Sequence, residues 1–133
     1  MYKRQLLISA HGHAYEKNRG VLGWNHILFE KEQLKKMNPK LTYFDSCQQG
    51  INLNYLEALQ EAEGLNYYIS PIISNDSGDS STKTIESFFK FLKENKNPII
   101  ALFKTKNKLN QHYKRKKKIT RYNKAFSFRI YEL

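Results

Sequence analysis

Residues 5–10 of the chain read QLLISA, a short apolar run that is followed at once by His11 and Gly12. A run of this length that ends at a glycine is typical of a buried strand. A second run, LTYFD at residues 41–45, has the same character and leads within two residues to Cys47. Segments with helical spacing of apolar residues alternate with such runs, which predicts an α/β fold with a mostly parallel sheet.

The remaining elements are predicted from the same kind of pattern. Helices are expected where apolar residues recur every three or four positions, and strands where short apolar runs are bounded by turn residues. We expect helices at residues 30–37, 54–63 and 83–94, further strands at 65–73, 99–103 and 125–131, a loop with a small hairpin at 12–26, and a basic flexible loop at 104–124. Residues 1–133 would form a single domain.

The two strand ends carry residues that suit covalent catalysis. In a parallel sheet, sites form at the carboxyl ends of the strands, where His11 and Cys47 would emerge together. A free thiol has a pKa of about 8.5, so an imidazole beside it would activate it and later protonate a leaving amine. Gly12 would let a substrate approach the backbone, and the amides of Gly12 and Cys47 would form an oxyanion hole.

These segments resemble the active-site motifs of the caspase-like (clan CD) cysteine peptidases. Residues 8–12, ISAHG, resemble the strand that ends in His-Gly, and residues 38–50, NPKLTYFDSCQQG, are similar to the segment that carries the nucleophile. The triplet at residues 45–47, Asp-Ser-Cys, is closer to metacaspases and to bacterial homologues of the CHAT type. The order of the two motifs and their separation of 36 residues suit the clan.

The resemblance implies a small three-layer caspase-like sandwich that acts as a cysteine endopeptidase without a cofactor or metal. His11 would be the general base and acid, and Cys47 the nucleophile. Residues 68–79 look like the stretch in which a metacaspase acid receives a basic side chain. Asp76 or Asp79 would then favour cleavage after Arg or Lys, although both also fit as ordinary turn residues.

The chain departs from the family pattern at its start. Family members have at least one strand and crossover before the strand that carries the histidine, whereas here that strand begins almost at Met1. The sheet would therefore have an open edge, and open edges invite pairing with another strand. A homo-oligomer or a partner chain that completes the sheet is expected, beside the protein or peptide substrate.

Less specific interpretations of the same residues remain open. A lone cysteine is more often a small buried hydrophobe than a nucleophile, and a strand-end histidine is commonly satisfied by backbone. The chain would then be a catalytically silent caspase-like module that binds a protein partner or nucleic acid. His11 and His13 share a strand face, but nothing in the sequence marks a third metal ligand.

The positive charge is concentrated late in the chain. Residues 1–103 carry 12 Lys/Arg against 11 Asp/Glu, whereas residues 104–133 carry 11 against one acid, Glu132. The basic run would contact phosphates, and the nearby tyrosines would stack on bases. The same run also fits a solvated connection between two strands or a segment for self-cleavage. The run itself is Lys114, Arg115, Lys116, Lys117 and Lys118.

The sequence also indicates where the protein works. No apolar run approaches the roughly 20 residues that span a bilayer, so no membrane partner is expected. The single cysteine allows no internal disulfide, and residues 5–10 are too short for the core of a signal peptide. A cytoplasmic location is therefore predicted.

Overall fold

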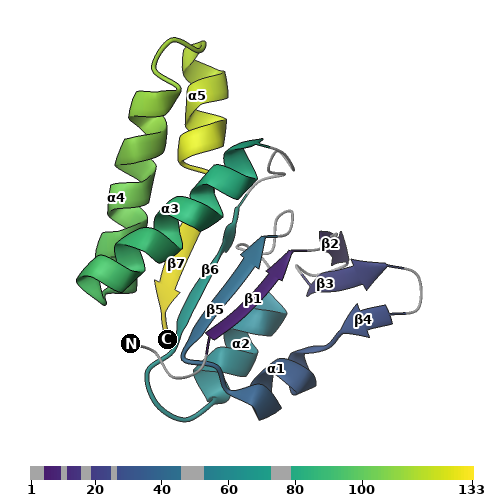
Figure 1. The fold of residues 1–133 in the computed structure, drawn as a ribbon. Helices are drawn as coiled ribbons and strands as arrows, with labels where there is room; N and C mark the ends of the chain where they lie inside the picture. The colour runs from purple at the N-terminus through teal and green to yellow at the C-terminus, as the bar shows by residue number, and fades with distance from the viewer. Residues whose placement is uncertain (1–4, 10–11, 16–18, 25–26, 46–52, 73–78) are drawn as a thin grey trace. The chain divides into compact units, whose positions relative to one another are not determined.

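The computed structural model describes the chain as two compact units (Figure 1). The sheet unit comprises Tyr2–Ser74 and Arg129–Leu133, and the helical unit comprises Asn75–Phe128. The described residues are 5–9, 12–15, 19–24, 27–45, 53–72 and 79–133, of which 12–15, 19–24, 27–29, 53 and 79 are described by their backbone alone. Each unit is considered separately below.

The sheet unit is built on a four-stranded sheet with the order β1-β5-β6-β7. β1 pairs with β5 and β5 pairs with β6, both in parallel. Asn66 and Leu133 exchange two backbone hydrogen bonds, of 3.0 and 2.8 Å, which is the pattern of an antiparallel pair beside β6. The chain is thus an α/β protein with a mixed, mostly parallel sheet. The strands are β1 Gln5–Ser9, β5 Leu41–Asp45, β6 Tyr67–Pro71 and β7 Phe128–Glu132.

Two helices, α1 (Lys31–Met37) and α2 (Leu53–Glu61), share one apolar core with this sheet. The ring of Phe44 meets those of Tyr55 and Tyr68 edge to face, with centroids 5.2 and 5.5 Å apart. Edge-to-face packing adds about 0.5–1.5 kcal/mol per pair beyond the burial of apolar area. The fully buried core residues are Leu34, Phe44, Tyr55, Ala58, Leu59 and Tyr68.

Helix α1 has clear signals at both ends. Glu30 and Gln33 form a reciprocal capping box at its start. Asn38 takes a left-handed conformation, φ 43°, at its end, directly before Pro39, which disfavours a further helical residue. The helix and the strand β5 that follows it were both expected from the sequence, and their positions are confirmed.

The segment expected to hold a small hairpin forms a separate three-stranded antiparallel sheet with the order β2-β3-β4. Gly12 pairs with Leu22 at one end of β2, and Tyr15 pairs with Arg19 at the other. The hairpin is confirmed, and a third strand extends it. The strands are β2 Gly12–Tyr15, β3 Arg19–Trp24 and β4 Ile27–Phe29.

The helical unit consists of α3 (Asp79–Asn95), α4 (Pro98–His112) and α5 (Lys118–Ala125). The strand expected at residues 99–103 is wrong, because α4 begins at Pro98 and runs through this apolar stretch. The flexible loop expected at residues 104–124 is also wrong. These residues continue α4, make a short turn and then form α5, and Leu109, Tyr113 and Ala125 close a small core between the two helices.

Candidate functional site

The two predicted catalytic motifs follow neighbouring parallel strands. β1 and β5 pair in register from Gln5 opposite Leu41 to Ser9 opposite Asp45, a constant offset of 36 positions. His11 and Cys47 are also 36 positions apart. The two strands therefore end side by side at the carboxyl end of the sheet. In the sequence, His11 comes two residues after the end of β1, and Cys47 comes two residues after the end of β5.

A side-chain hydrogen bond joins the two strand ends. The hydroxyl of Ser9 donates to the carboxylate Oδ2 of Asp45 at 3.0 Å. A hydrogen bond to a charged acceptor is worth about 1.5–3 kcal/mol when it is protected from water, and less at an exposed position such as this. The bond links the last residues of β1 and β5, the two strands that precede the candidate dyad.

The strands of the sheet unit differ in how deeply they are buried. Residues 41–44 of β5 and all five residues of β6 are buried, whereas β1 alternates between exposed and half-buried positions. Burial raises the pKa of the Tyr43 hydroxyl well above its ordinary value, and the charge of Asp45 raises it further. Tyr43 therefore stays protonated even at moderately alkaline pH.

β1 is the outermost strand of the four-stranded sheet as far as the described strands extend. The side chain of Leu7 at its centre is 47% exposed. An edge strand presents unpaired backbone donors and acceptors to any strand that can add to it. The open edge expected from the sequence is therefore present in the sheet as described.

Most of the residues predicted for the peptidase site lie outside the residues that the structure describes. His11, Cys47 and Asp76 are outside the described residues, so the structure brings together the strands that carry the dyad but gives no distance between its side chains. Gly12 is the first residue of β2 and Asp79 the first residue of α3, both as backbone only. The sequence interpretation missed Ser9, although its offset of 36 from Asp45 already matched that of the dyad.

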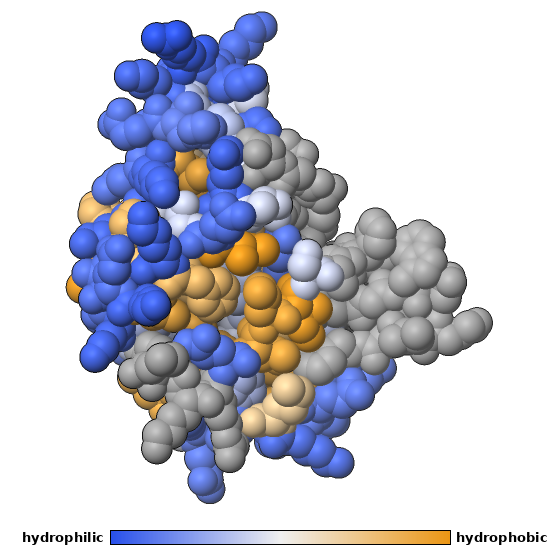
Figure 2. Space-filling view, viewed as in Figure 1, coloured by the Kyte–Doolittle hydropathy of each residue, from blue (hydrophilic) through white to orange (hydrophobic). Residues whose placement is uncertain are grey.

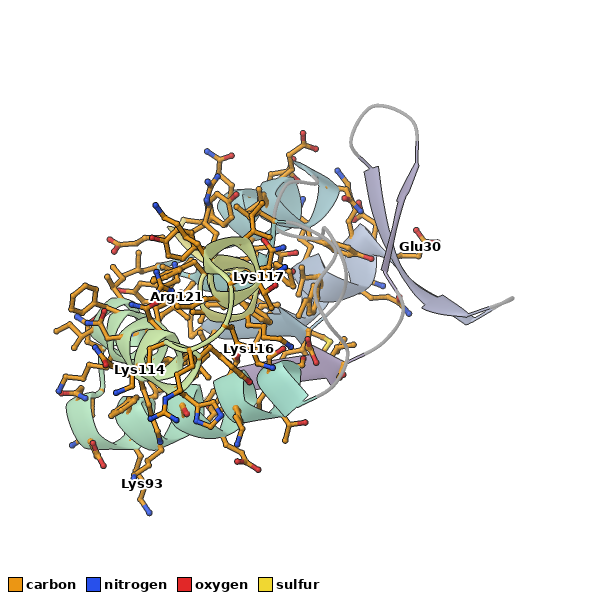
Figure 3. All side chains as sticks on the ribbon, turned by 90° about the horizontal axis from the view of Figure 1, so that it is seen from above. Glu30, Lys93, Lys114, Lys116, Lys117 and Arg121 are labelled. Carbon is orange, nitrogen blue, oxygen red and sulfur yellow. The ribbon has the colours of Figure 1, made fainter. Side chains whose placement is uncertain are left out.

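A second candidate site lies in the helical unit, on α5 and the turn before it. Cations surround the half-exposed ring of Tyr122: Lys118 Nζ is 5.9 Å and Arg121 Cζ 5.0 Å from its centroid. Phe126 stands edge to face with the same ring at 5.7 Å. Figure 3 shows Lys114, Lys116 and Lys117 near the turn between α4 and α5, and Arg121 on α5. The predicted cluster Lys114, Arg115, Lys116, Lys117 and Lys118 is exposed throughout.

The described part of the chain contains neither a metal-ligand cluster nor a membrane-spanning helix. Among those residues, no three His, Cys, Asp or Glu side chains come together as metal ligands. Over the same part, no helix combines the length and apolar character needed to cross a bilayer. Comparison with known proteins finds neither a matching protein-family model nor a matching curated protein.

Proposed function

We propose that the chain is a caspase-like cysteine endopeptidase in which Cys47 is the nucleophile and His11 the proton carrier. One observation carries this proposal. β1 and β5 are parallel neighbours in a register of 36, the separation of His11 and Cys47. Adjacent strands lie about 4.8 Å apart, so residues that follow them at equal distance begin within reach of each other.

The chemistry proposed for this edge is acyl transfer. His11 takes the proton of the Cys47 thiol as sulfur attacks the scissile carbonyl carbon, and returns it to the amine as the peptide bond breaks. Water activated by the same imidazole then cleaves the thioester and releases the acid. The amides of Gly12 and Cys47 would stabilise the oxyanion, an interaction that can contribute a factor of about 10²–10³ per donor.

The finer features of the proposal follow from the resemblance. Asp76 or Asp79 would receive a basic side chain of the substrate. The whole domain would be a three-layer caspase-like sandwich. The open edge of β1 supports a second copy or a partner chain that completes the sheet. Cytoplasmic proteolysis suits a chain with a single cysteine, since thiols stay reduced there.

Peptidase activity is tested with fluorogenic peptides that carry Arg, Lys or Asp before the scissile bond. Wild-type protein should release fluorophore from at least one of them, and Cys47→Ala should abolish release. His11→Ala should reduce it by several orders of magnitude, because the thiolate fraction falls. Folded wild-type protein with no turnover that depends on Cys47 would refute the peptidase proposal.

The geometry of the dyad can be tested without any substrate. Because Cys47 is the only cysteine, the rate of alkylation by iodoacetamide reports on this thiol alone. A thiol activated by His11 should react well below the pH range of an ordinary thiol, and His11→Ala should move its rate profile up to that range. Identical profiles for the two proteins would show that the imidazole does not contact the sulfur.

A second candidate function is supported by the helical unit. Its α5 surface combines the cations around Tyr122 with the neighbouring ring of Phe126, which suits single-stranded nucleic acid. The chain would then be a caspase-like module without activity that binds nucleic acid, or a protein partner, through residues 104–124. Cys47→Ala protein should bind oligothymidylate with an affinity that falls steeply with salt. Absence of binding at low salt would contradict this function.

A further inference from the structure

The helical unit contains a hollow between α3 and α4 whose lining includes none of the α5 residues around Tyr122, although its α4 residues lie within residues 104–124. Its volume is about 230 Å³. Three of its lining residues, Lys108, Leu109 and His112, come from the last turns of α4. The others come from α3: Lys83, Glu86, Ser87 and Lys90.

Contacts along α3 and α4 show how the two helices face each other. Lys104 Nζ donates to Asn95 Oδ1 at 3.3 Å, and Lys108 Nζ lies 5.8 Å from the ring centroid of Phe91. A step of four residues forward on α4 thus matches a step of four residues back on α3, as in an antiparallel pair. The next turn on each helix brings residues 112 and 87 opposite each other, at the hollow.

The spacing of the lining residues gives the hollow a polar rim and a buried floor. Positions 83, 87 and 90 are four and three residues apart, so they lie on one face of α3. Ser87 is 5% exposed and Leu109 is 2% exposed, and these two form the floor. Lys90, Lys108 and His112 are exposed at the rim.

The charge around the hollow favours an anion. Lys90 and Lys108 contribute two positive charges, which Glu86 and the carboxyl end of α4 oppose with about 1.5 negative charges in total. The balance is positive even with His112 neutral. From Asn95 to Phe128 the chain has eleven Lys/Arg and no Asp or Glu, so the surrounding field has the same sign. Figure 2 shows the corresponding hydrophilic surface over α4 and α5.

We propose that this hollow binds a phosphate group, carried by a free nucleotide or by the backbone of a single-stranded nucleic acid. Ammonium groups from two helices and the Ser87 hydroxyl line the same hollow, and donors on several sides suit a tetrahedral dianion better than a planar carboxylate. The inference concerns the helical unit alone and does not depend on peptidase activity at Cys47.

The test uses isothermal titration calorimetry on the full chain at low salt, with inorganic phosphate, AMP and a short oligothymidylate as separate probes. Lys90→Gln and Lys108→Gln each remove one rim cation. Lys93→Gln is the matched control, since Lys93 is an exposed lysine of α3 outside the lining and apart from the labelled basic turn (Figure 3). Circular dichroism checks that each variant keeps its helices.

Each rim variant should raise the Kd about tenfold, as expected for the loss of a charge-assisted hydrogen bond, and Lys93→Gln should leave it nearly unchanged. Weakened binding of AMP and phosphate alone would identify a free nucleotide as the source. Weakened binding of the oligothymidylate would identify the nucleic-acid backbone. The proposal is overturned if no probe binds, or if Lys90→Gln and Lys108→Gln affect every probe no more than Lys93→Gln does.

Discussion

The sheet unit and the helical unit differ in both charge and packing. The sheet unit carries nine Lys/Arg against eight Asp/Glu, and the helical unit fourteen against four. The first has an aromatic core of fully buried side chains, whereas the second buries Phe88, Ala101 and Leu102 on α3 and α4, beside a small cluster of Leu109, Tyr113 and Ala125. The sheet unit is thus nearly neutral, and the helical unit carries most of the excess positive charge.

The largest effect is expected from the core of the sheet unit. Phe44→Ala should lower the free energy of unfolding by about 3–5 kcal/mol, because it removes a fully buried ring that contacts two others. Phe126→Ala in α5 is the matched control; its ring is 37% exposed and should cost far less. Urea denaturation measures both, and equal losses would show that burial of the ring does not determine its contribution to stability.

The next effect concerns nucleic-acid binding at the basic turn. Replacing Lys114, Lys116 and Lys117 with Gln should weaken binding of oligothymidylate and lower the slope of log K against log salt by about 2, since each single-strand phosphate contact contributes about 0.7. The matched control replaces three lysines of the sheet unit, Lys35, Lys36 and Lys40. Fluorescence anisotropy at several salt concentrations gives both slopes, and equal slopes would show that charge position is irrelevant.

A smaller effect is expected at alkaline pH. Burial raises the pKa of Tyr68 above its ordinary value of 10.0, in spite of the opposing hydrogen bond with Ser70. Its contribution to stability is therefore complete below pH 10 and is lost as pH rises, because the unfolded chain ionises first. Tyr68→Phe should make the fall of the urea midpoint above pH 10 less steep. Parallel curves for the two proteins would contradict this assignment.

The smallest effect is expected from a surface ion pair. Lys35 Nζ lies 3.0 Å from Glu61 Oε2, and its hydrogen bond and charge lower the pKa of Glu61 below 4.5. The pair stabilises the sheet unit at neutral pH, and this contribution is lost as pH falls through the lowered pKa. Glu61→Gln should reduce the melting temperature slightly at neutral pH and not at strongly acid pH. A difference that persists in acid or in high salt would point to another cause.

The sequence predicted the sheet unit well because local pattern and tertiary packing agree there. LTYFD is β-rich, apolar and bounded by Pro39, and the structure has β5 at Leu41–Asp45 as expected. The helical unit was harder to predict, because a short apolar run such as IIALF fits a strand as well as a buried turn of helix. The decisive signal was the pair before it: Asn97 accepts hydrogen bonds from two amides of the first turn, and Pro98 suits the first helical position.

The candidate sites show the same division. The sequence predicted two strands before His11 and Cys47, and the structure shows that these strands, β1 and β5, are parallel neighbours in a register of 36. The hollow between α3 and α4 was not predicted, because Lys108, Leu109 and His112 come from a helix in a segment that had been expected to be a flexible loop. Spacing along α3 alone does not reveal which residues of another helix face it.

The antiparallel strand β7 has a consequence for how the protein is made. Residues 128–132 pair beside β6, yet the whole helical unit lies between these two strands in the chain. During synthesis, β1, β5 and β6 emerge first. The pairing of β6 with β7 becomes possible only after the more than fifty residues of the helical unit have been synthesised. The entropic cost of closing so long a loop grows only slowly with its length. The sheet is therefore completed only after the helical unit has been synthesised, and the length of that unit adds little to the entropic cost of pairing β7 with β6.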